Sequence, residues 1–105
     1  MTLIEFLTAR LDEDEQLALR ARGDYFSFEV LGRFSAVGDA AHVIRHAPAR
    51  VLAEVEAKRQ ILADCMATIA NAGAGPGEYG LALSTIQSLA LPYADHDDYR
   101  QEWRP

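Results

Sequence analysis

The longest unbroken pattern of apolar and polar positions runs from Pro48 to Asn71. Its apolar residues recur at steps of three and four, which places them on one side of a helix, with polar residues such as Glu54 opposite. These apolar residues are Val51, Leu52, Val55, Leu62, Met66 and Ile69. Pro48 suits the first helical turn, and Gly73 suits a left-handed exit. The pattern therefore predicts one long central helix on which a mainly α (α+β) fold is organised.

The N-terminal residues predict a first helix. Thr2 and Glu5 have the spacing of a capping box, in which each side chain accepts a hydrogen bond from the backbone amide of the other. An apolar stripe follows, and Gly23 is typical of a helix end. The stripe consists of Leu3, Ile4, Leu7, Leu11, Ala18 and Ala21. We therefore expect this helix to run to about Arg22.

Two charged residues interrupt the apolar stripes of these helices. Asp14 lies on the side of Leu7 and Leu11, and Arg59 lies between Val55 and Leu62. If the helices pack antiparallel, the two charges meet, and a buried unpaired charge would cost on the order of several kcal/mol. We therefore hypothesise that they form an ion pair. The alternative is that each side chain reaches the edge of the interface and stays hydrated.

The period changes between Asp24 and Val37. Apolar residues alternate with polar ones, and a glycine-containing turn then leads to a second short apolar run. We therefore predict a short β-hairpin over residues 24–37, inserted after the first helix, with a helical continuation through residues 24–31 as the alternative. Asp39 is placed as the N-cap of a shorter helix that ends at about His46.

A glycine- and proline-rich loop at residues 73–77 separates the central helix from a further helix, Glu78 to Leu91. This helix is apolar around most of its circumference. Leu81 and Leu91 point away from its main apolar face. They pack under the chain that follows, or they form an exposed patch that binds a protein partner or a second copy.

The C-terminal tail, residues 92–105, contains two aromatic residues four positions apart, Tyr99 and Trp103. Aromatic side chains at this spacing share one side of a helical turn and anchor it to another surface. The surface is the protein's own core, or it is the groove of a partner that the pair fills.

Composition and charge limit the function classes. With 105 residues, half of them hydrophobic and a quarter charged, the chain fits a single domain over residues 1–105. Sixteen acidic and ten basic residues give a net charge of −6, which disfavours direct binding to nucleic acid. No apolar run has the ~20 residues of a membrane span, and no secretory signal precedes the first helix. We expect a cytoplasmic protein without membrane contact.

Three histidines form the one constellation that resembles a chemical site. His42 and His46 are four residues apart on a predicted helix, and a third ligand would come from the Asp95–Asp98 segment, which contains His96. The signal is weak, because the accompanying glutamate of an H-E-x-x-H motif is missing. Cys65 has no partner for an internal disulfide and suits a small apolar core position. The sequence therefore predicts no cofactor, with a metal ion as the alternative.

Three stretches resemble a known family: Thr2 to Glu15, His42 to Arg59 and Leu89 to Trp103. They are similar to short uncharacterised proteins of actinobacteria, Streptomyces especially, and of their phages. The resemblance implies an actinobacterial or phage source and a cytoplasmic setting. It implies no activity and no catalytic residues.

Two functions follow as hypotheses. The first is a non-enzymatic protein-interaction or accessory domain that binds a partner or itself through surplus apolar surface; its candidate residues are Leu81, Leu91, Tyr99 and Trp103. The alternative is a small metal-dependent hydrolase with His42, His46 and His96, or an aspartate next to His96, as ligands and an acidic residue that positions water.

Overall fold

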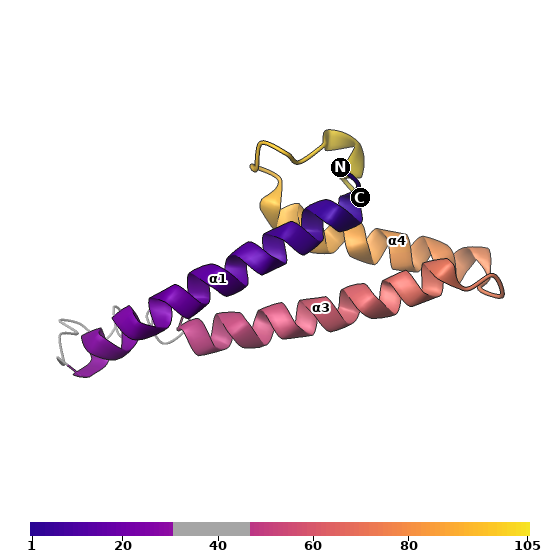
Figure 1. Ribbon diagram of the computed structural model, residues 1–105. Helices are drawn as coiled ribbons and strands as arrows, with labels where there is room; N and C mark the ends of the chain where they lie inside the picture. Colours follow the sequence, from indigo (N-terminus) through magenta and orange to yellow (C-terminus); the bar gives the residue numbers. More distant parts are fainter. Residues whose placement is uncertain (31–46) are drawn as a thin grey trace. The chain divides into compact units, whose positions relative to one another are not determined.

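The described part of the chain is helical. The structure, a computed structural model, describes the backbone of residues 1–30 and 47–105 and the side chains of residues 1–22 and 47–105. Three α-helices lie in these ranges, followed by two short 3-10 helices, and the same ranges contain no strand (Figure 1). These elements are α1 (Leu3–Val30), α3 (Pro48–Ala70), α4 (Pro76–Ala90), η1 (Leu91–Tyr93) and η2 (Gln101–Trp103). The predicted mainly helical fold is confirmed.

The predicted hairpin is not supported, because residues 24–30 belong to helix α1. Residues 31–37, like the predicted short helix with His42 and His46, lie outside the described residues. A growing helix gains one hydrogen bond for each residue it adds, whereas a single glycine such as Gly23 costs only about 1 kcal/mol relative to alanine. Continuation therefore overrides the short alternating pattern. The prediction of a single long central helix is also wrong, since α1 has 28 residues and α3 has 23.

Helix α1 begins with the predicted capping box. The Glu5 amide donates to the Thr2 hydroxyl at 3.1 Å, and the Thr2 amide donates to the Glu5 carboxylate at 3.2 Å. The hydrogen bond that the Thr2 backbone amide donates to the Glu5 carboxylate lowers the pKa of Glu5 below its ordinary value, and a hydrogen bond with the Thr2 side chain lowers it further. Two of the amides that a helix start leaves without helical partners are therefore satisfied.

The link between α3 and α4 depends on Asn71 rather than on a left-handed glycine. The Gly73 amide donates to the Asn71 side-chain oxygen at 2.9 Å, and the Ala74 amide donates to the Asn71 carbonyl at 3.0 Å. The backbone of Gly73 is not left-handed, so the predicted role of this residue is wrong. Helix α4 begins at Pro76, inside the predicted loop, because proline is compatible with the first helical turn.

The chain divides into two compact units. The first contains Met1–Leu11 and Ala57–Pro105, and the second is Asp12–Glu56. Helices α1 and α3 each contribute to both units. The core of the first unit is Phe6, Leu7, Leu11, Leu62, Cys65, Ala82, Ile86, Ala90, Tyr99 and Trp103. The buried apolar side chains described in the second unit include Ala18 and Val55.

Two predictions stay open after this division. Asp14 belongs to the second unit and Arg59 to the first, so their ion pair remains a prediction, as does the single domain. Within the described ranges, every helix is too short or too polar to cross a membrane.

Acid should remove the stabilisation that the Glu5 carboxylate of the capping box gives to the fold. Because the folded-state pKa of Glu5 is lowered, its carboxylate stabilises the fold above the pKa of the unfolded chain, and this stabilisation is lost as the pH falls through the folded-state pKa. Glu5→Gln should therefore lower the free energy of unfolding at neutral pH, and the difference from wild type should shrink in acid. Urea titrations between neutral and acidic pH measure this difference in the free energy of unfolding. Glu56→Gln is the matched control, because it makes the same substitution outside the capping box. A difference that does not vary with pH would contradict the assignment.

Gly80 offers a stabilising substitution. It lies inside α4, is exposed, and a Cβ at this position would meet no atom within 4 Å. Gly80→Ala should raise the free energy of unfolding by about 1 kcal/mol, because alanine loses less backbone entropy in a helix. Gly80→Pro should lower it by about 3 kcal/mol, because proline removes a helical hydrogen bond. Thermal unfolding followed by circular dichroism compares the two variants, and an unchanged or lower Tm for Gly80→Ala would refute the prediction.

Candidate functional site

A groove lies between α3 and α4, within the first unit. It has a volume of about 270 Å³ and is lined by seven residues. On each helix the lining positions recur at steps of one, three and four residues, so that each helix presents one side to the groove. The lining residues are Asp64, Cys65 and Thr68 of α3, and Glu78, Leu81, Ala82 and Thr85 of α4.

The groove has an apolar floor and an exposed leucine at its edge. Cys65 and Ala82 are buried and belong to the core, in agreement with the interpretation of Cys65 as a small apolar residue. The Leu81 side chain is 70% exposed, the largest exposed fraction among the large hydrophobic residues that the structure describes. A single exposed leucine is common on protein surfaces, so it is the apolar hollow beside Leu81 that makes this place a candidate interaction site.

Two carboxylates are the charged groups of the groove. Asp64 accepts a hydrogen bond from the Gln60 amide at 3.0 Å, and neither Asp64 nor Glu78 forms an ion pair with any described residue. The two threonine hydroxyls are used by their own helices. Thr68 donates to the carbonyl of Asp64 at 3.1 Å, and Thr85 donates to that of Leu81 at 2.7 Å. The polar character of the groove is therefore acidic.

Further apolar side chains are exposed on the same two helices. Leu91, which follows α4, is 38% exposed, so that both leucines that the sequence analysis assigned to an apolar surplus reach the surface. The others are Ile61 and Met66 of α3 and Tyr79 and Leu83 of α4.

A second groove lies in the second unit. It has a volume of about 290 Å³, and Leu17, which is 51% exposed, stands in its wall. Its described lining is Asp14, Leu17, Ala18 and Ala21 of α1 with Pro48 and Val51 of α3. Asp14, the one carboxylate of this described lining, takes part in interactions within the protein. This groove therefore resembles the first in size but differs from it in charge.

Tyr99 and Trp103 are buried in the core rather than exposed. Their ring centroids lie 5.8 and 5.2 Å from that of Phe6, and 5.6 Å from each other. The two tail aromatics therefore dock onto the first turns of α1. Of the two surfaces that the sequence allowed for them, they pack on the protein's own core rather than in the groove of a partner. Phe6, which is fully buried, was missed because the predicted stripe passed through its neighbour Leu7. The clue was the pair of adjacent apolar residues, which widens the buried side of a helix.

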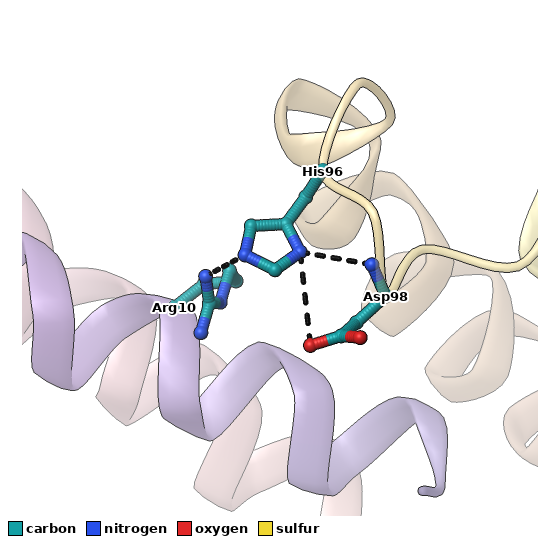
Figure 2. Close-up of polar contacts among 3 residues, drawn as sticks. All are labelled: Arg10, His96 and Asp98. Carbon is teal, nitrogen blue, oxygen red and sulfur yellow. Dashed lines mark hydrogen bonds and ion pairs between the residues drawn. The ribbon is translucent and has the colours of Figure 1, made fainter.

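His96 is part of the same aromatic cluster, and Figure 2 shows its polar contacts with Arg10 and Asp98. Its ring meets Phe6 edge-on at 5.5 Å between centroids, and its Nδ1 accepts the Asp98 amide at 3.0 Å. Nε2 faces the guanidinium of Arg10. A guanidinium and a backbone amide both only donate, and a neutral imidazole accepts at one nitrogen, so the two contacts require opposite tautomers and do not assign the ring proton. Each ring nitrogen therefore faces a hydrogen-bond donor, Arg10 at Nε2 and the Asp98 amide at Nδ1.

The described residues do not test the predicted metal site. His42 and His46 lie outside the described residues, and in the ranges 1–22 and 47–105 no three His, Cys, Asp or Glu side chains are grouped as metal ligands. The guanidinium of Arg10 at Nε2 of His96 is unfavourable for a cation at that nitrogen. The site of His42, His46 and His96 stays a prediction.

The hydroxyl of Tyr99 provides a test of the aromatic cluster. It is buried and has no hydrogen-bond partner among the described residues. Tyr99→Phe should therefore leave the free energy of unfolding unchanged or raise it by up to about 1 kcal/mol, because a desolvated hydroxyl is removed. Phe6→Ala, which opens a cavity in the same cluster, should lower it by about 3–5 kcal/mol. Urea unfolding measures both, and a clear loss of stability in Tyr99→Phe would show that the hydroxyl is bonded.

Comparison with known proteins gives a family but no activity. No curated protein and no solved structure matches the chain. A family model does match, over residues 1–105, and it describes a family of unknown function. This finding confirms the part of the resemblance that concerns an uncharacterised family, whereas the actinobacterial or phage source stays a prediction. The chain belongs to the family of unknown function DUF6221.

Proposed function

We propose that this protein is a non-enzymatic interaction domain that binds a protein partner in the groove between α3 and α4. Leu81 is the anchor of the contact, and Leu91 extends the apolar surface beyond the end of α4. Tyr99 and Trp103 are left out of this surface because their side chains hold the core together. The resemblance to actinobacterial and phage proteins favours a cytoplasmic accessory role.

The observation that supports this proposal is the position of Leu81. Its side chain is 70% exposed beside a floor formed by Cys65 and Ala82. Full burial of a leucine side chain is worth roughly 1.5–3 kcal/mol, which corresponds to about ten- to hundredfold in affinity. One apolar group from a partner that covers Leu81 and fills the groove would realise this gain.

The described groove is less suited to catalysis. Its hydroxyls donate to helix carbonyls, and its described lining contains no histidine that could act as a base for these hydroxyls or for Cys65. The alternative, a metal-dependent hydrolase, takes His96 or a neighbouring aspartate as its third ligand, and the contacts of the two His96 ring nitrogens do not favour the histidine in that role. We therefore retain the interaction domain as the proposed function.

Site-specific photo-crosslinking tests the proposal in cells that encode the protein. A photoreactive amino acid at position 81 should give a covalent adduct with a discrete partner, whereas the same amino acid at the exposed Ser84 of α4, which does not line the groove, should give little. The partner, once identified by mass spectrometry and purified, should bind wild type and lose at least about tenfold in affinity to Leu81→Asp.

Leu17→Asp is the matched control. It places the same charge on an exposed leucine that lines the groove of the second unit. It should bind the partner as wild type does, and circular dichroism verifies that both variants fold. Equal adduct formation at positions 81 and 84, or equal losses of affinity in the two aspartate variants, would refute the assignment of the partner to the α3–α4 groove.

A further inference from the structure

We infer that the occupant of the α3–α4 groove is a basic amphipathic helix of a partner protein. The helix places an apolar side chain against Leu81 and sets lysine or arginine side chains beside Asp64 and Glu78. This inference rests on the proposed function, and it adds the shape and charge of the partner segment.

The shape of the groove supports a helical occupant. The lining positions of α4 extend from Glu78 to Leu81, Ala82 and Thr85, which is about two helical turns, and those of α3 extend over one turn. Two neighbouring helices with a hollow between them accept a third helix, whose side chains at positions i, i+3, i+4 and i+7 enter the hollow. An extended strand is disfavoured, because the backbone groups of both helices are already bonded within them.

The charge of the groove supports a basic occupant. Asp64 stands on α3 and Glu78 on α4, so that carboxylates border the apolar floor from both helices. Among the described residues, neither carboxylate has a cationic partner, and no lysine or arginine lines the groove. Lysine or arginine residues that flank an apolar anchor would meet both carboxylates. An acidic helix would instead be repelled.

The same charges disfavour a second copy as the occupant. In a two-fold dimer the same patch meets itself, so that Asp64 and Glu78 of both copies would share one interface. Each chain also carries a net charge of −6, which opposes self-association. A partner of opposite charge turns these repulsions into attractions.

Selection from a peptide library tests the inference. The full-length protein is the bait, and the probe is a displayed library of helical peptides of about 20 residues, a length at which isolated helices form. The selected peptides should share one large apolar residue flanked by lysine and arginine, with more basic residues than the unselected library. A synthetic version of the most enriched peptide should bind in fluorescence anisotropy more weakly as salt is added.

Three variants of the protein separate the contributions. Leu81→Asp should weaken binding of that peptide by at least about tenfold. The double variant Asp64→Asn, Glu78→Gln should weaken it by about three- to tenfold and flatten its salt dependence. The control Asp95→Asn, Asp97→Asn removes the same total charge from exposed positions of the tail and should leave binding unchanged.

The outcomes distinguish failure of the inference from failure of the proposed function. Apolar peptides without an excess of basic residues, bound through Leu81 but insensitive to Asp64→Asn, Glu78→Gln, would overturn the inference and leave the interaction domain in place. Enrichment of no peptide, or of peptides that bind Leu81→Asp as well as wild type, would overturn both. Concentration-dependent dimers of the wild-type protein, lost in Leu81→Asp, would favour a second copy and overturn the basic partner.

Discussion

The packing of the tail aromatics on Phe6 is the interaction on which the rest of the first unit depends. Phe6 is fully buried, and it contacts the rings of Tyr93, His96, Tyr99 and Trp103. The tail has little regular structure of its own, namely the end of η1 at its start and η2 at residues 101–103. Its position is therefore set by the aromatic contacts rather than by backbone hydrogen bonds. These contacts bring the two ends of the chain close together (Figure 1).

This arrangement explains why α4 has one covered side and one open side. Ala82, Ile86 and Ala90 turn one side of the helix into the core. The tail packs on Phe6 and does not extend over Leu81, which stays exposed. A net charge of −6 helps to keep a protein with such a surface in solution.

The sequence predicted those features that depend on neighbouring residues. The capping box of Thr2 and Glu5 and the start of α3 at Pro48 follow from local hydrogen bonding and from the geometry of proline, and both are present. The predictions of a helix end at Gly23 and of a left-handed exit at Gly73 were wrong. Glycine permits a helix end or a left-handed turn but does not require either, and the cooperativity of α1 and the side chain of Asn71 decide the outcome.

The parts that depend on distant residues were harder to predict. Leu81 and Leu91 were identified as surplus from helical periodicity alone, but the groove beside Leu81 requires α3 and α4 to be neighbours. Phe6 was missed because its partners lie at the other end of the chain. For Tyr99 and Trp103 the spacing showed that they anchor something, and only the fold shows that the anchor point is Phe6.

The distance along the chain between these partners has a kinetic consequence. Arg10 and His96, which meet beside Phe6, are 86 positions apart. Closing a loop of that length costs roughly 4 kcal/mol of chain entropy, and this cost precedes any gain from the contact. Individual helices form within about a microsecond, so joining the ends should be the late event in folding. The slow step in folding of this helical protein is thus the formation of long-range contacts, as it is in folds that have many such contacts.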